Sequence, residues 1–416
     1  MLLPGGDRPA GRTRGSCPLH DGAQDADGRT GSSHLHLLFI RCPAGIQVRG
    51  GEWYSVSSAE PLVGGVPSVI GHRGASGYRP ENTLASYELA ARLGADRIEP
   101  DIVPTRDGVL VLRHESEVTH STDVASRPDL AARRTTRVVD GQPVTGWFTE
   151  DLSYDELRSL RAVEPRPHLR PTTTVYDGLY EVPTFAELLE LAAQLRLELG
   201  RTIVVTAEVK APSRYAEDGF DVAALVIAEL RRLGLDEPDA PVALQCFESA
   251  FLRRLRAEGL RVPLVQLVED DDAGRAACTP WGLREVSTYA EVLAPCKDMV
   301  LPVAADGTLG PATPLVADAH RAGLAVHVWT LRNENAFLPV SLRVGPSEAA
   351  PGRALVEHLA FLDAGVDGIF TDHPDTGFEA RRLWAAGKAV PGARRGGSGG
   401  PSSAAGSASS GQRLAG

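Results

Sequence analysis

Three carboxylates follow short apolar runs that are typical of strands in a parallel sheet. Side chains alternate between the two faces of a strand, so Glu99 and Asp101 point the same way, and Glu208 and Lys210 repeat this arrangement further along. Because unpaired buried charges are costly, three carboxylates kept together favour a hard divalent cation with oxygen ligands, Mg²⁺ or Ca²⁺. Zinc is disfavoured because no cysteine joins the cluster. The alternative is three separate surface charges at strand ends.

Two histidines occupy comparable positions at the ends of predicted strands. His72 closes the first apolar run, and His114 ends the run that follows the first two carboxylates. A single histidine is more often structural, but histidine is also the usual proton shuttle near neutral pH. Two histidines beside three carboxylates, with Arg73 and Lys210 to hold an anion, favour cleavage of a phosphate ester. In that reaction, cations neutralise the phosphate oxygens while one group activates a nucleophile and another protonates the leaving oxygen.

The elements that must position these side chains alternate along residues 66–386. Short β-branched runs are separated by amphipathic segments of helical length, the pattern of βα units around a parallel sheet. The predicted strands are 68–72, 96–102, 203–210, 242–247, 263–267, 298–301, 325–330 and 366–371. The predicted helices are 82–93, 184–199, 222–233, 249–258, 284–293, 311–322, 354–364 and 376–386.

Eight such units in roughly 320 residues predict a TIM (β/α)8 barrel of the α/β class. A doubly wound sheet is the alternative. The extra length is a small insertion after the second strand, at about 116–180, which contains a hairpin-like segment (VVDGQPVTGW) and is expected to cap one barrel mouth. Both termini, a leader at 1–65 and a Gly/Ser/Ala-rich tail at 387–416, are predicted to be disordered.

Composition excludes several classes of partner. The 416 residues carry 43 Lys+Arg against 54 Asp+Glu, a formal net charge of −11, and no dense basic cluster that would bind nucleic acid or an anionic membrane.

The five cysteines lack metal-finger spacing and are interpreted as reduced structural thiols. No apolar run approaches the roughly 18 residues of a membrane span, so stable membrane insertion is not expected. No signal peptide is evident, which favours the cytoplasm.

Motifs in chain order resemble one enzyme family over about residues 68–380. They are GHRG at 71–74, PENT at 80–83, EPD at 99–101, TRDG at 105–108, LRHE at 112–115, EVK at 208–210, VWT at 328–330 and GVDGIFTD at 365–372. This ordered set resembles the glycerophosphodiester phosphodiesterases, in particular the bacterial glycerophosphoryl diester phosphodiesterase type. One departure is Glu115, where many members carry Asp.

The resemblance implies hydrolysis of a small-molecule glycerophosphodiester to sn-glycerol 3-phosphate and an alcohol, dependent on one divalent cation, Ca²⁺ or Mg²⁺. It implies that the glycerol 2-hydroxyl attacks phosphorus and that water then opens the cyclic phosphate, with two histidines exchanging acid and base roles. Likeness to a secreted branch also leaves secretion open. The implied roles are acid/base catalysis for His72 and His114, metal ligation for Glu99, Asp101 and Glu208, phosphate binding for Arg73 and Lys210, and a wall of the site for Trp329.

Several alternatives stay open on the sequence. The same residues suit a lysophospholipase D-like enzyme or another phosphodiester hydrolase. A non-catalytic module that binds phosphorylated headgroups is disfavoured, because a pure binder needs no proton-transfer groups. Gln245 and Gln266, near the ends of two predicted strands, could bind glycerol or a headgroup or could be satisfied core amides. Either Asn82 or Thr83 is expected to cap the first helix.

Overall fold

The structure is a computed structural model, and it describes residues 65–139 and 141–387. Apart from residues 65 and 387, the predicted leader and tail lie outside the described residues. No helix in the described part of the chain is long and apolar enough to cross a membrane.

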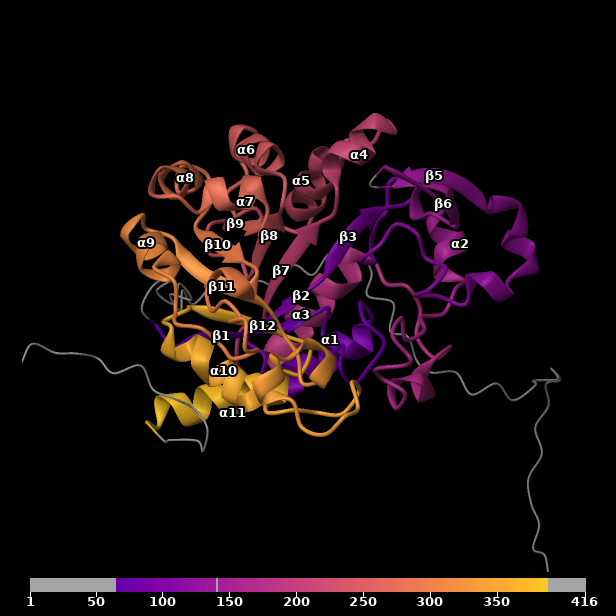
Figure 1. The fold of residues 1–416 in the computed structure, drawn as a ribbon. Coiled ribbons are helices and arrows are strands. Elements are labelled where there is room, and N and C mark those ends of the chain that lie inside the picture. Colours follow the sequence, from indigo (N-terminus) through magenta and orange to yellow (C-terminus); the bar gives the residue numbers. More distant parts are fainter. Residues whose placement is uncertain (1–64, 140, 388–416) are drawn as a thin grey trace, which may run out of the picture. The chain divides into compact units, whose positions relative to one another are not determined.

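Eight parallel strands of the described chain close into a barrel (Figure 1). The ring is complete because β1 pairs with both β12 and β2, and β2 pairs with β7. This closure confirms the predicted TIM barrel and excludes the doubly wound alternative. The barrel strands are β1 (Ser68–His72), β2 (Arg97–Glu99), β7 (Val204–Val209), β8 (Val242–Cys246), β9 (Leu264–Val268), β10 (Val292–Pro295), β11 (Ala325–Leu331) and β12 (Gly368–Thr371).

Helices follow the barrel strands and surround the barrel (Figure 1). Thr83 caps the first of them by accepting a hydrogen bond from the Ser86 backbone N–H, and Thr184 and Glu187 form a capping box at another. The helices are α1 (Leu84–Arg92), α3 (Phe185–Leu199), α4 (Pro212–Glu217), α5 (Val222–Arg232), α6 (Ser249–Ala257), α7 (Asp272–Ala277), α8 (Pro280–Val286), α9 (Leu315–Arg321), α10 (Ala354–Asp363) and α11 (Pro374–Ala385).

The sixth barrel strand differs from the prediction, while the other seven predicted strands overlap observed ones. The predicted strand at 298–301 is wrong, because a 3₁₀ turn (Lys297–Met299) begins that region and β10 ends before it. The predicted helix at 284–293 is also wrong beyond Val286, where α8 ends, and its last two residues belong to β10. A short apolar run has no periodicity that separates a buried strand from a helix end. Here the parallel pairing of β10 with β9 and β11 identifies the segment as a strand.

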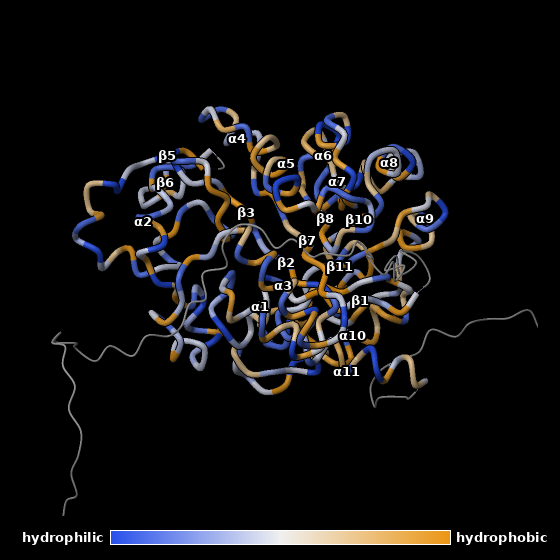
Figure 2. Tube along the Cα trace, turned by 180° about the vertical axis from the view of Figure 1, so that it is seen from behind, coloured by the Kyte–Doolittle hydropathy of each residue, from blue (hydrophilic) through white to orange (hydrophobic). Residues whose placement is uncertain are grey.

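The insertion contains the predicted hairpin. β5 (Thr135–Val139) and β6 (Gln142–Gly146) pair antiparallel, and α2 (Tyr154–Arg158) follows them. These elements lie beside β3 (Asp101–Pro104) in both views (Figures 1 and 2). The later part of the insertion reaches the carboxyl ends of the barrel strands, where Arg170 donates a hydrogen bond to the carbonyl oxygen of Ser76 at 2.9 Å.

The inner faces of the strands change from apolar to polar toward their carboxyl ends. Figure 2 shows apolar stretches (orange) along strands such as β7 and β11. Ile70 of β1 and Ala243 of β8 belong to an apolar cluster of buried residues. Two residues further along the same faces come His72 and Gln245. The barrel therefore presents polar groups at its C-terminal mouth, where enzymes with this fold place their active sites.

Gly71 marks a close approach between β1 and α1. A Cβ added there would lie 2.8 Å from Cβ of Ala90 and 3.0 Å from the carbonyl oxygen of Gly74. Because neither atom belongs to a flexible side chain, we expect Gly71→Ala to lower the free energy of unfolding by about 1–3 kcal/mol. Urea unfolding followed by circular dichroism measures this change, and an unaltered midpoint would contradict the packing described for β1.

Candidate active site

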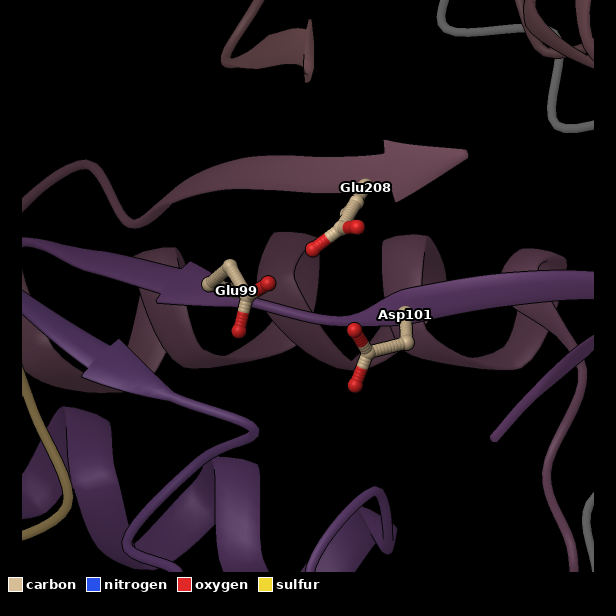
Figure 3. A group of neighbouring side chains, drawn as sticks. All are labelled: Glu99, Asp101 and Glu208. Atoms are coloured by element: carbon tan, nitrogen blue, oxygen red, sulfur yellow. The ribbon is translucent and has the colours of Figure 1, made fainter. Parts of the chain in front are cut away.

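Three buried carboxylates meet at the barrel mouth. Glu99 ends β2, Asp101 begins β3, and Glu208 lies on the neighbouring strand β7, in register with Asp101. One ligand atom from each lies within 4.8 Å of the others. Figure 3 shows the three carboxylates turned toward one another from these strands. Strand alternation and register thus produce the cluster that the sequence predicted.

Polar side chains behind the cluster fix its orientation. Asn82 Nδ2 donates to Asp101 Oδ2 at 2.8 Å, and the Tyr87 hydroxyl donates to Asn82 Oδ1 at 2.5 Å. Gln245 Nε2 donates to Glu99 Oε1 at 3.0 Å. Of the two residues expected to cap α1, Thr83 is the cap, and Asn82 instead orients a carboxylate.

The electrostatics of the cluster fit a cation. Burial, and then the charges of Asp101 and Glu208, raise the pKa of Glu99 well above its ordinary value. Burial also acts to raise the pKa of Asp101, but the Arg73 guanidinium holds it below its usual range. Two buried oxygens, Asp101 Oδ1 and Gln245 Oε1, accept no hydrogen bond from the described residues. An all-oxygen set with spare acceptors and mutual repulsion could hold a divalent metal ion.

His72 is buried at the end of β1 and is held by an aspartate. Its Nδ1 lies 2.6 Å from Oδ1 of Asp372, which follows β12. Burial, and then the neighbouring Arg73 cation, lower the pKa of His72 to about 4. Burial alone would raise the pKa of Asp372, but Arg332 and Arg170 hold it well below its usual range. At neutral pH the pair is therefore a neutral imidazole hydrogen-bonded to a carboxylate.

The other predicted residues complete the same site. His114 follows β4 (Leu110–Leu112), and its Nδ1 lies 2.5 Å from Oε1 of Glu115. Lys210 Nζ lies 2.7 Å from Glu208 Oε1, and Arg73 Nη1 donates to Glu81 Oε1 at 2.9 Å. A cavity of about 350 Å³ opens here. Its lining includes His72, Arg73, Glu99, His114, Glu208, Lys210 and Trp329, with Asp101 buried beside them.

Aromatic and amide groups form another side of this cavity. Trp329 and Phe247 meet edge to face with ring centroids 5.7 Å apart, and the indole N–H donates to the carbonyl oxygen of Ala294 at 2.8 Å. Gln245 also lines the cavity. Gln266 instead donates to backbone carbonyls and accepts from the Tyr289 hydroxyl at 2.8 Å, so it is a satisfied core amide.

Three residues of the site received no role from sequence reasoning. Asp372 is the last residue of the GVDGIFTD motif. Its position directly after the last strand was the feature of the sequence that could have indicated a place in the site. Arg332 also follows a strand and donates to Asp372 Oδ2 through Nε at 2.7 Å. Arg170 lies in the irregular insertion, 202 residues before Asp372, and nothing in its local sequence indicated that it contacts the barrel.

The fold and these side chains define a TIM-barrel hydrolase of the phosphodiester class. The model of the glycerophosphoryl diester phosphodiesterase family matches residues 72–376. The chain belongs to this family, as its motifs predicted.

Individual relatives agree with this assignment. A glycerophosphodiester phosphodiesterase from Arabidopsis thaliana is 30% identical over 358 residues, which cover 81% of this chain and 92% of that protein. One from Haemophilus influenzae is 28% identical over 343 residues, covering 75% of this chain and 88% of that protein. A phosphodiesterase from Oleispira antarctica, solved in complex with the product sn-glycerol-3-phosphate, has a similar fold, with a TM-score of 0.52 and 21% identity over 76% of this chain and 96% of that chain.

Metal binding should depend on pH through Glu99. Because its pKa is raised, the Glu99 carboxyl binds a proton more tightly than an ordinary glutamate does, and a cation that binds there competes with that proton. We expect the affinity for Ca²⁺ or Mg²⁺ to be weaker at about pH 6 than at about pH 8, with proton release on binding. Calorimetric titrations in two buffers of different ionisation enthalpy measure both quantities. An affinity that does not change with pH would contradict this electrostatic picture, and Glu99→Gln should reduce the released protons.

Proposed function

We propose that this chain hydrolyses glycerophosphodiesters to sn-glycerol 3-phosphate and an alcohol with the help of one divalent cation, Ca²⁺ or Mg²⁺. The observation that carries the proposal is a cavity of about 350 Å³ whose lining includes two histidines, the cations Arg73 and Lys210, and two of the three clustered carboxylates. The product complex of the Oleispira antarctica phosphodiesterase supports the identity of the product. The match of the family model to residues 72–376 supports residues 66–386 as the catalytic domain.

The binding roles follow from charge and position. Glu99, Asp101 and Glu208 would hold the cation, and Arg73 and Lys210, which line the same cavity, would bind the phosphate oxygens. A bound divalent cation supplies Lewis acidity that stabilises charge developing on the phosphoryl oxygens. Trp329 would form a wall against which the substrate packs.

His72 is suited to accept the first proton. An ionised carboxylate can only accept hydrogen bonds, so the contact with Asp372 places the ring hydrogen of His72 on Nδ1 and leaves the lone pair on Nε2. With a pKa of about 4, the ring is neutral at neutral pH. Its Nε2 takes the proton of the glycerol 2-hydroxyl while the hydroxyl oxygen bonds to phosphorus.

His114 completes the proton transfers. Its Nδ1 is occupied by Glu115, so Nε2 is the nitrogen available to the substrate. His114 protonates the leaving alcohol oxygen as the phosphorus–oxygen bond breaks, which leaves a cyclic phosphate. In the second step His114 takes a proton from water as the water oxygen bonds to phosphorus. His72 returns its proton to the 2-oxygen as the ring opens, so the net reaction consumes one water.

Removal of either histidine should strongly reduce the rate of hydrolysis. We expect His72→Ala and His114→Ala to lower the rate of glycerol 3-phosphate release from glycerophosphocholine by roughly 10²–10⁴-fold, the usual contribution of general acid–base catalysis. The matched control is His120→Ala, an exposed histidine a few residues after His114, which should keep wild-type turnover. A folded His72→Ala variant with near-full turnover would refute the assignment.

The same assay tests the cation. We expect EDTA to abolish turnover and either Ca²⁺ or Mg²⁺ to restore it, because the clustered carboxylates need a positive charge before they can share a site with an anionic substrate. The ion that restores more activity identifies the preferred cofactor. Wild-type protein that binds the metal but does not cleave glycerophosphocholine would redirect the proposal to lysophospholipids and other phosphodiesters.

A further inference from the structure

Arg170 connects the insertion to the barrel mouth through all parts of its guanidinium group. Nε donates to Glu334 Oε1 at 2.7 Å, Nη1 donates to the carbonyl oxygen of Ser76 at 2.9 Å, and Nη2 donates to Asp372 Oδ2. The residue is 3% exposed. Three partners from three different segments use the planar fork of an arginine in a way that a lysine could not reproduce.

Asp372 lies between this arginine and the proposed base. Its Oδ1 contacts Nδ1 of His72, and its Oδ2 accepts hydrogen bonds from both Arg170 and Arg332. The carboxylate is fully buried, so it depends on paired charges to remain ionised. Among the described residues, Arg332 lines the cavity and Arg170 does not, which leaves Arg170 as the partner shielded from substrate.

We propose that Arg170 is a positioning residue for catalysis, which holds the Asp372 carboxylate so that Asp372 fixes the ring and tautomer of His72. The insertion then contributes to the catalytic apparatus and is more than a cover over the barrel. This inference rests on the proposed role of His72 as the proton acceptor. It assigns to Arg170 an effect on turnover, exerted through Asp372, with little effect on substrate binding.

A purely structural role makes a different prediction. If Arg170 only anchors the insertion, its loss lowers thermal stability, and any change in rate is independent of Asp372. If Arg170 acts through Asp372, removing both residues costs no more than removing Asp372 alone. A double-mutant cycle measured in kcat separates these cases.

The experiment compares Arg170→Gln, Arg170→Lys, Asp372→Asn and the Arg170→Gln/Asp372→Asn double variant, with glycerophosphocholine and a saturating divalent cation. We expect Arg170→Gln to lower kcat by about 10–100-fold, as for other residues that orient a catalytic group. KM should stay within about threefold, because Arg170 does not face the cavity. Arg170→Lys should recover part of kcat, and the double variant should match Asp372→Asn within about twofold.

Arg158→Gln is the matched control. Arg158 lies in the same insertion, its side chain is half exposed, and its carboxylate partners Glu181 and Glu187 lie 3.4 and 3.9 Å away. We expect its kcat to equal that of the wild type. Melting temperatures of all variants are measured in parallel, so that a loss of fold is separated from a loss of rate.

Wild-type kcat in Arg170→Gln, or a double variant whose loss is the product of the two single losses, would overturn the proposal. Should Arg170→Gln not fold, Arg170→Lys replaces it, and a wild-type kcat there would equally overturn the proposal. Full activity of Asp372→Asn would instead refute the role of the His72–Asp372 pair. Absence of wild-type turnover would refute the proposed function itself.

Discussion

Mutual repulsion among three buried carboxylates is the constraint on which the rest of the site depends. Glu99, Asp101 and Glu208 are all buried, and they bring ligand oxygens within 4.8 Å of one another. Such a cluster is stable only if positive charge or hydrogen-bond donors offset it. The surrounding amides and cations provide part of that offset, while burial and then the charges of Asp101 and Glu208 still raise the pKa of Glu99, an effect that a bound cation would oppose.

The barrel reaches this arrangement with simple strand geometry. Pro100 has no backbone N–H, and it separates β2 from β3 while its carbonyl oxygen still accepts from the Glu208 backbone N–H at 2.8 Å. The segment therefore keeps contact with β7 on both sides of Pro100, and two of its carboxylates face the third. A closed parallel barrel then adds the ends of β1 and β8, which carry His72 and Gln245, to the same mouth.

Residues whose positions depend on local strand geometry could be placed from the sequence, and residues whose positions depend on long-range contacts could not. His72 and Glu99 follow apolar runs, so strand alternation placed them correctly. The sixth strand was misplaced because only its pairing with β9 and β11 distinguishes β10 from a helix end. Arg170 was missed because an irregular insertion has no periodicity that shows where it folds back. Its contact with Asp372 exists only in three dimensions.

The two phosphate-binding candidates connect metal binding to substrate binding. Lys210 Nζ lies 2.7 Å from Glu208 and 3.6 Å from Asp101, and Arg73 Nε lies 3.3 Å from Asp101. These ion pairs partly neutralise the carboxylates, but they also occupy the groups that an anionic substrate needs. Neutralisation of the triad by a divalent cation would weaken all three ion pairs and leave Lys210 and Arg73 to the phosphate. Since an effect of one ligand on the affinity for another is reciprocal, bound substrate should in turn raise the affinity of the site for the cation.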